Sequence, residues 1–298
     1  MKIVMLGHSG AGKTTYLSLM YAEMQVGIGG FQVRAKDGGQ HGQLLADARA
    51  IRSSRYPPAT NRRASYELAL RYNGAEVLPF TWRDHRGGAA SGRTSDGADV
   101  AQLHQDLLQS DAIVLFVDGH ALVREPTAAR NARRLSSHVL RAMRDRPLVP
   151  TPLVIAVTKS DLIDIDDEKV GEQVFAPVEE LAKAVAGTKH IFGTVIPVAC
   201  GPAPMNVVVP VLWSLRFGLN GMLIRLGTEV ESSVKAANAA ARRDTLLDRV
   251  GSWWRGESSY ATIAQNYRQA ALRAQQQIRP LVKPAEGLEQ MLKDVRYF

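Results

Sequence analysis

The chain has 298 residues, of which 45% are hydrophobic and 22% charged, and this composition is typical of a soluble globular protein. Its formal net charge is +8, but the basic residues form no uninterrupted run and accompany no recognised nucleic-acid module. No specific nucleic-acid partner is therefore expected, while a peripheral contact with an anionic membrane is left open. A single cysteine, Cys200, excludes an internal disulfide framework and a cysteine-based zinc site, which favours a reducing cytoplasm.

The first predicted element is a short buried strand, Lys2–Leu6, which is also too short to be a signal peptide. The next residues, Gly7–Thr14, read GHSGAGKT and match the phosphate-binding pattern G-x-x-x-x-G-K-[ST]. An apolar face from Lys13 to Met24 predicts the helix that must follow such a loop. Lys13 is expected to neutralise the outer phosphates and Thr14 to ligate Mg²⁺ through its hydroxyl. The residues expected to contact the phosphates are Gly7, His8, Ser9, Gly10, Ala11, Gly12, Lys13, Thr14 and Thr15.

A long polar stretch follows from Gly27 to Thr60, with a helix expected near Leu44–Ile51. Beyond it, Tyr66–Tyr72 alternates apolar and polar residues, which is typical of a half-buried strand. Asn73-Gly74 is the strongest short hairpin signal available, and Val77–Trp82 then returns as the paired strand. These residues predict an antiparallel hairpin at the edge of a sheet.

Asp84-His85-Arg86-Gly87 comes directly after the second strand of this hairpin. A carboxylate at this position can hold Mg²⁺, directly or through water, and the Gly87 N–H can meet a γ-phosphate. Asp84 is therefore expected to be a metal ligand and a catalytic residue. Asp-x-x-Gly alone is a weak signal, but its place downstream of a phosphate-binding loop strengthens it.

The second half of the chain alternates strands and helices. Strands are predicted at Ala112–Val117, Leu153–Val157 and Thr194–Val198, and helices at Thr127–Arg144 and Lys169–Ala186. The fully apolar strands are expected only in a sheet that is covered on both faces. The fold class is therefore α/β: a doubly wound, mostly parallel sheet with one antiparallel edge hairpin.

Thr158-Lys159-Ser160-Asp161 follows the buried strand at Leu153–Val157. A carboxylate there can accept hydrogen bonds from N1–H and the 2-amino group of guanine. Adenine lacks both donors, so it would leave the carboxylate unpaired. Lys159 can lie along the base and brace the phosphate-binding loop.

The pattern changes after Pro204, and helices are expected to the end of the chain. Val207–Leu226 has the length of a membrane span, but Arg216 lies near its middle, so the interpretation is a closing helix packed on the sheet. Further helical segments are expected near Glu229–Arg249 and Tyr260–Gln277. We therefore expect a nucleotide-binding domain over residues 1–226 and a helical C-terminal extension over residues 227–298.

The three motifs, in this order and at these strand ends, resemble the G1, G3 and G4 boxes of the TRAFAC class of P-loop GTPases. Pro197-Val198-Ala199-Cys200 lies where that family has its base-contacting G5 loop, which implies that Ala199 and Cys200 contact the base. The opening GHSGAGKTTYLSLMY and the Trp-x-Asp-x-x-Gly turn further resemble bacterial double-GTPase proteins of conflict and defence systems. The resemblance implies GTP or GDP with Mg²⁺ as ligands, and a second GTPase as a partner.

The chain departs from the family at the place where Ras-like members carry a glutamine that positions water, because Gly88 stands there. His85 is one residue that could orient the water, and an arginine finger from Arg55, Arg62 or Arg63 is another. Thr60, after Pro57-Pro58, is the candidate for the switch threonine that contacts Mg²⁺ and the γ-phosphate.

The function expected from the sequence is hydrolysis of GTP to GDP and phosphate with Mg²⁺, with slow intrinsic turnover. The γ-phosphate would order the segments Arg49–Thr60 and Gly87–Asp99, and a protein effector would read that state. Two alternatives stay open: a GTP-binding regulatory or scaffold module with negligible hydrolysis, and an ATP-using enzyme with the same loop.

Overall fold

The computed structural model describes residues 1–57, 64–84, 97–243 and 260–298 of the chain. The described residues form two compact units, and each is described by itself. The first comprises Met1–Gly218 and Leu288–Phe298, and the second comprises Leu219–Gly287. The expected division into a nucleotide-binding domain over residues 1–226 and a helical extension over residues 227–298 stays a prediction.

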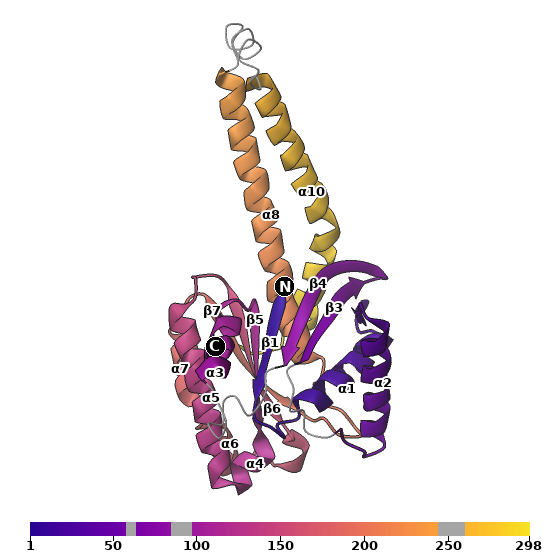
Figure 1. Ribbon diagram of the computed structural model, residues 1–298, viewed down its shortest axis with the longest axis vertical. Coiled ribbons are helices and arrows are strands. Elements are labelled where there is room, and N and C mark those ends of the chain that lie inside the picture. The colour runs from indigo at the N-terminus through magenta and orange to yellow at the C-terminus, as the bar shows by residue number, and fades with distance from the viewer. Residues whose placement is uncertain (58–63, 85–96, 244–259) are drawn as a thin grey trace. The chain divides into compact units, whose positions relative to one another are not determined.

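A seven-stranded sheet organises the first unit, in the order β2-β3-β4-β1-β5-β6-β7 (Figure 1). Its strands are β1 (Lys2–Gly7), β2 (Phe31–Ala35), β3 (Ala64–Tyr72), β4 (Ala75–Asp84), β5 (Ala112–Asp118), β6 (Thr151–Thr158) and β7 (Ile191–Val198). The pairings from β4 through β1, β5 and β6 to β7 are parallel, whereas β2 with β3 and β3 with β4 are antiparallel. The predicted α/β class, with a mostly parallel sheet and an antiparallel edge, is confirmed.

The turn between β3 and β4 forms where the sequence predicts it. Asn73 and Gly74 have φ angles of 48° and 84°, the left-handed values that a two-residue hairpin turn requires. The additional edge strand β2 lies within the polar stretch and was not predicted. Phe31 and Val33 are buried, the other three residues are more exposed, and the strand pairs with β3 from Phe31 opposite Tyr72 to Ala35 opposite Leu68.

The helices of the first unit cover both faces of the sheet. They are α1 (Lys13–Val26), α2 (Gly38–Arg52), α3 (Gly97–Leu108), α4 (Gly119–Arg124), α5 (Pro126–Asp145), the 3₁₀ turn η1 (Ser160–Leu162), α6 (Glu168–Phe175), α7 (Glu179–Ala186) and the first part of α8 (Val209–Arg243). The single helix expected over Lys169–Ala186 is two helices, α6 and α7. Pro177 lies between them, where its ring and missing N–H interrupt the helical hydrogen bonds.

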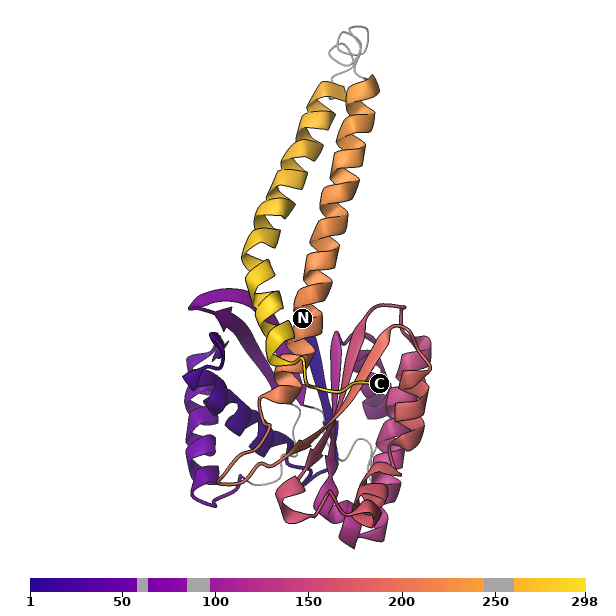
Figure 2. The same cartoon turned by 180° about the vertical axis from the view of Figure 1, so that it is seen from behind.

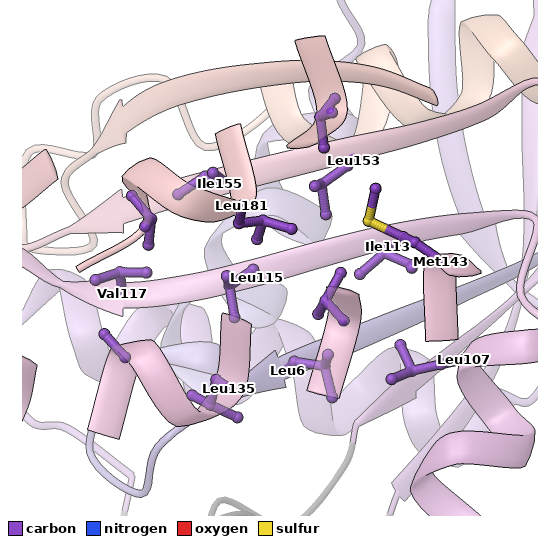
Figure 3. Close-up of a cluster of buried hydrophobic side chains, with 14 of the residues drawn as sticks. Leu6, Leu107, Ile113, Leu115, Val117, Leu135, Met143, Leu153, Ile155 and Leu181 are labelled. Carbon is purple, nitrogen blue, oxygen red and sulfur yellow. The ribbon is translucent and has the colours of Figure 1, made fainter. Parts of the chain in front are cut away.

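One face of the sheet packs against α3, α5 and α7. Figure 3 shows Leu6, Leu115 and Ile155, from three neighbouring strands, in one cluster with helix residues that include Leu135 and Leu181. These five side chains are at most 2% exposed. Each such buried side chain contributes on the order of 1.5–3 kcal/mol to stability, so the cluster fixes these helices on the sheet.

The opposite face packs against α1 and the beginning of α8. The Tyr16 ring of α1 lies 4.9 Å from Phe116 of β5 and 6.0 Å from Trp82 of β4, measured between ring centroids. Phe217 of α8 lies 4.8 Å from Phe192 of β7 in the same measure. These aromatic contacts hold the helix that follows the glycine-rich loop against the centre of the sheet.

The last residues of the chain return to the sheet after α10 (Tyr260–Met291) (Figure 2). Phe298 and Gly193 of β7 exchange backbone hydrogen bonds of 2.8 and 3.0 Å. The Thr194 hydroxyl donates to the Arg296 carbonyl at 2.7 Å. Because β7 is the outermost strand on this side, these bonds cover part of its open edge.

The second unit is a helical hairpin made of the later part of α8 and most of α10 (Figure 1). Instead of the two segments expected from Val207 to Arg249, α8 is one continuous helix of 35 residues to Arg243. The buried side chains of the hairpin are mostly small, and they include Ala237, Ala240, Ala264, Ala271 and Ala274. Within the described residues, no helix is both long and apolar enough to cross a bilayer.

Candidate nucleotide-binding site

The loop between β1 and α1 is wound tightly by two glycines. Gly10 and Gly12 have φ angles of 83° and 80°, which residues with a side chain rarely adopt. The Ala11 N–H donates to the His8 carbonyl at 3.1 Å, and α1 begins at Lys13. The loop therefore meets the N-terminus of a 14-residue helix, where free N–H groups and the helix dipole favour an anion such as phosphate.

Close packing beneath the loop explains a further glycine. A Cβ added to Gly7 would lie 2.9 Å from Phe116 Cβ and 3.0 Å from the Phe116 carbonyl oxygen. Any side chain here would push the start of the loop away from β5. Gly7 therefore sets how close the loop lies to the sheet.

Lys13 and Asp84 lie side by side at the base of the loop. Lys13 Nζ donates to the Gly7 carbonyl at 2.8 Å and lies 3.9 Å from Asp84 Oδ1. Both residues are buried, at 8% and 6% exposure. Burial lowers the pKa of Lys13, opposed by the nearby Asp84 carboxylate. Burial raises the pKa of Asp84 to about 6, opposed by Lys13.

The donor set beside Lys13 fits Mg²⁺. Asp84 Oδ1 is buried and accepts no hydrogen bond from any residue that the structure describes. Thr14 belongs to the lining of the same cavity. No group of three or more His, Cys, Asp or Glu side chains suited to a metal occurs among the described residues. A carboxylate and a hydroxyl completed by phosphate oxygens are the usual ligands of Mg²⁺ in nucleotide sites.

The end of β6 is tied directly to the loop. The buried Thr158 hydroxyl lies 3.0 Å from the Ala11 carbonyl and 3.2 Å from the Val117 carbonyl, to either of which it can donate. Lys159 follows with a left-handed φ of 56°, and its Nζ lies 2.5 Å from Asp118 Oδ2 at the end of β5. Because β1, β5 and β6 are parallel and end at the same edge of the sheet, the phosphate-binding loop and the Thr158–Asp161 motif lie in one region.

Asp161 and the loop after β7 face each other across the far side of this region. Asp161 is exposed, and its Oδ2 lies 3.6 Å from the position that a Cβ on Gly201 would occupy. Burial raises the pKa of the neighbouring Cys200 to about 12, and the Asp161 carboxylate adds to this effect. Cys200 is therefore a neutral thiol at physiological pH.

A cavity of about 540 Å³ joins the phosphate-binding loop to Asp161. The residues expected from the sequence that line it are His8, Ser9, Gly10, Ala11, Gly12, Lys13, Thr14, Thr15, Asp84, Thr158, Lys159, Asp161 and Cys200. Gly7 and Ala199 lie outside the lining; Gly7 contributes its carbonyl to Lys13, and Ala199 is buried in a backbone bridge to Met205. The predictions for Thr60, His85 and Gly87, and the remarks on Arg62, Arg63 and Gly88, fall outside the described residues.

Several cavity residues were not named individually as site residues, namely Tyr56, Pro57, His120, Leu162 and Gly201, although the first two lie in the segment expected to be ordered by the γ-phosphate. Tyr56 is 57% exposed, and its hydroxyl lies 3.9 Å from the position of a Cβ on Gly201. Arg55, considered as an arginine finger, is exposed and does not line the cavity. No local pattern marks Tyr56, because only the folded chain brings the end of α2 towards the loop after β7.

A strand, a glycine-rich loop and a helix N-terminus, with a buried lysine and carboxylate beside them, define a P-loop nucleotide-binding protein. The family model for Double-GTPase 2 matches residues 2–196, about two thirds of the chain, and the protein belongs to this family. Membership gives it a P-loop GTPase fold and guanine nucleotide as its ligand.

Comparison with solved structures finds further similar chains. The SRb–GTP/SRX complex of the signal recognition particle receptor from Chaetomium thermophilum is 18% identical, with a TM-score of 0.43, over 73% of this chain and 97% of that one. A GTP-binding protein from Sulfolobus solfataricus in complex with GDP is 15% identical, with a TM-score of 0.37, over 70% and 49%. The Sar1 GTPase from Encephalitozoon cuniculi in complex with GDP is 14% identical, with a TM-score of 0.33, over 72% and 77%. A comparison with curated proteins gives no match.

Proposed function

We propose that this protein hydrolyses GTP to GDP and phosphate with Mg²⁺ and acts as a nucleotide-dependent switch for a protein partner. One observation carries the proposal: a single cavity contains the phosphate-binding loop, the buried Lys13 and Asp84, and the carboxylate of Asp161. These groups suit the three things that a GTPase must hold, namely the phosphates of GTP, its base and the accompanying Mg²⁺ ion.

Each described group has a distinct task in this proposal. The loop amides from Gly10 to Thr15 and the positive end of α1 bind the phosphate oxygens. Lys13 moves from the Gly7 carbonyl to the outer phosphates. Thr14 and Asp84 would hold Mg²⁺, which would supply positive charge beside the phosphates. Asp161 accepts hydrogen bonds from guanine and thereby rejects adenine.

The water-orienting group is proposed to come from outside the described residues. Gly88 offers no side-chain amide for this purpose, so His85 and an arginine finger from Arg62 or Arg63 stay the candidates, and slow intrinsic turnover is expected. This feature favours the alternative of a regulatory module that binds GTP and barely hydrolyses it.

Residues at the ends of two segments lie beside the phosphate-binding loop, and this supports the proposed switch. Tyr56 and Pro57, at the end of the segment that follows α2, line the cavity, and Asp84 lines it where β4 ends. Tyr56 and Pro57 belong to segment 49–60, and Asp84 lies shortly before segment 87–99. A γ-phosphate bound in the cavity would therefore be close enough to order both segments. The partner would be a protein effector or a second GTPase, and the single cysteine supports a cytoplasmic location.

Single-turnover hydrolysis tests the enzymatic proposal. Purified protein in excess over labelled GTP and Mg²⁺ is expected to release phosphate, and Lys13→Ala should abolish this release. Lys189→Ala is the matched control, because Lys189 is an exposed lysine outside the cavity. Phosphate release no faster than in Lys13→Ala, with GTP still bound, would leave only the regulatory module.

Nucleotide competition tests the remaining alternative, an ATP-using enzyme. Labelled GTP should resist displacement by a large excess of ATP, because a site built for guanine donors leaves Asp161 unpaired with adenine. Equal competition by ATP and GTP would contradict the role proposed for Asp161.

A further inference from the structure

One face of α5 is a continuous row of arginines. Arg130, Arg133, Arg134, Arg141 and Arg144 are all exposed, and this helix carries no lysine. At 3.6 residues per turn, the five side chains fall within about 100° of the helix circumference, along roughly 21 Å of its axis. The buried residues of α5, such as Leu135 and Val139, occupy the opposite side. We call these five residues the arginine row.

The arginine row is not neutralised by the residues around it. None of its five members forms an ion pair with any residue that the structure describes, whereas Lys159, Lys183 and Arg83 are paired with Asp118, Glu179 and Asp106. Asp145 is the sole acidic residue of α5, and its carboxylate lies 3.2 Å from His104 of α3. The row is therefore a surface of like charge with its donors available.

Acidic residues also occur on a helix next to α5. The helix α7, which packs against α5, begins with Glu179 and Glu180. An anionic membrane plane or a nucleic-acid duplex would bring phosphates over these carboxylates as well. The basic surface is about one helix wide, which favours an acidic polypeptide segment over either broad polyanion.

Two further features of the arginine row favour an acidic polypeptide as its partner: all its charges are guanidinium groups, and exposed apolar residues follow its C-terminal end. Arginine presents a planar fork that pairs with carboxylates through two parallel hydrogen bonds. Directly after α5, Leu148 and Val149 are 81% and 48% exposed, which offers an apolar contact at the end of the charged row. Arginines beside an apolar contact are characteristic of protein interfaces.

The N-terminal half of α5 lies against the phosphate-binding loop. Asn131 and Ala132 line a second cavity, of about 330 Å³, together with His8 and Ser9. Burial lowers the pKa of His8, nearby cations that include Lys13 and Arg134 lower it further, and the Asn131 backbone opposes this shift. A partner bound along α5 would therefore contact a helix that touches the nucleotide loop.

We propose that the arginine row of α5 is the docking surface for an acidic segment of a partner protein. The acidic segment would be a helix with its carboxylates along one face, so that they pair with the five arginines. An apolar residue of the same segment would contact Leu148. The inference rests on the proposed function in so far as a switch requires a partner. The surface itself can be tested with and without nucleotide.

The test uses the full-length protein and a fluorescein-labelled synthetic helical peptide as the probe. The peptide carries five glutamates on one face at the spacing of the arginine row, and a second peptide has the same composition with its glutamates distributed around the helix. Anisotropy at low ionic strength should show at least about tenfold tighter binding of the patterned peptide. The triple variant R133Q/R134Q/R141Q should lose about tenfold in that affinity, by the sum of three exposed ion pairs.

The control is R225Q/R268Q/R279Q, which removes the same charge from exposed arginines of the second unit. It should bind the patterned peptide as the wild type does, and all variants should keep their GDP affinity. The reversed variant R133E/R134E/R141E should bind a matching lysine-patterned peptide instead.

Three results would overturn the docking surface: equal binding of both glutamate peptides, an equal loss in the control triple, or no binding of the lysine peptide by the reversed variant. Stronger binding of phosphatidylserine vesicles or duplex RNA, lost in R133Q/R134Q/R141Q, would likewise overturn it by assigning the row to another class of partner. Failure of the proposed function is seen separately, as a wild-type protein that does not bind or hydrolyse GTP.

Discussion

Lys159 Nζ lies 2.5 Å from Asp118 Oδ2, which joins the lysine of the Thr158-Lys159-Ser160-Asp161 motif to a carboxylate that lies outside all three sequence motifs. The other carboxylate oxygen, Oδ1, accepts a hydrogen bond of 2.9 Å from the Ala121 N–H and caps α4. Asp118 therefore holds Lys159 and the start of α4 at the same time. Because Lys159 lines the cavity between the phosphate loop and Asp161, we propose that Asp118 positions Lys159 for nucleotide binding.

Replacing Asp118 by asparagine should weaken guanine nucleotide binding without unfolding the protein. Asparagine keeps an oxygen for the cap on α4 but removes the charge that orients Lys159. A partly exposed pair of this kind contributes on the order of 1 kcal/mol, so GDP affinity should fall about fivefold. Isothermal titration with GDP measures this change.

The control for this prediction separates charge from capping. Asp167 caps α6 through the Lys169 and Val170 N–H groups and does not line the cavity, so Asp167→Asn should leave GDP affinity unchanged. Unaltered GDP binding in Asp118→Asn would show that Lys159 needs no carboxylate partner.

Asp161→Asn should change which base the protein prefers. Xanthine presents an oxygen where guanine has its amino group, so the amide N–H₂ of asparagine can donate to it and the carboxylate cannot. We expect GDP affinity to fall at least about tenfold and XDP affinity to rise. Displacement of a fluorescent GDP analogue by GDP, XDP and ADP measures all three. A parallel loss for GDP and XDP would contradict base recognition by this residue.

Much of the fold could be predicted because its signals are local. The apolar strands β5 and β6 and the turn at Asn73-Gly74 depend on short runs of residues, and all three form where the sequence predicts them. The strand β2 escaped prediction because its five residues include Gln32 and Arg34 and depend on pairing with β3. The division between α6 and α7 depends on Pro177, whose effect outweighs the helical periodicity around it.

The candidate site likewise contains residues that a local sequence pattern predicts and residues that only the folded chain brings together. The phosphate-binding loop could be recognised because its chemistry requires certain residues at fixed spacing. Asp118 and Tyr56 carry no such spacing. Tyr56 lines the cavity because α2 ends close by, whereas Asp118 contacts Lys159 of the lining because the parallel strands β5 and β6 end at the same edge. The exact form of the base loop also depends on packing, since Ala199 is held in a bridge with Met205 while Cys200 lines the cavity.

Thr158→Val should uncouple the phosphate-binding loop from β6. Valine has the shape of threonine but cannot donate to the Ala11 or Val117 carbonyl. Loss of a buried hydrogen bond costs about 1–3 kcal/mol in unfolding free energy, and the loosened loop should also bind GDP more weakly. Urea unfolding and GDP titration measure the two effects.

Thr194→Val is the matched control for this variant. Thr194 is equally buried, on β7, and donates to the Arg296 carbonyl at 2.7 Å, away from the cavity. It should show a similar loss of stability with normal GDP affinity. A Thr158→Val protein that behaves like Thr194→Val would contradict the coupling.

Asp84 should make the nucleotide-free protein less stable as the pH rises. Its pKa is about 6 in the folded state and 3.8 as the reference value for an unfolded chain, because burial penalises the charged carboxylate. Between these values the folded state binds more protons than the unfolded state, so the unfolding free energy falls as pH increases from about 4 to about 6. Above pH 6 the full penalty, on the order of 3 kcal/mol, is present.

The variant Asp84→Asn removes this penalty, because an amide carries no charge to desolvate. Urea unfolding in the absence of nucleotide and Mg²⁺ should therefore show Asp84→Asn to be more stable than the wild type at pH 7.5, with the difference shrinking towards pH 4. Asp166→Asn, which changes an exposed carboxylate, should show no such difference. In the wild type, Mg²⁺-dependent GTP affinity should fall below pH 6, since a protonated Asp84 is a poor ligand. A stability difference independent of pH would mean that Asp84 acts through packing and not through its charge.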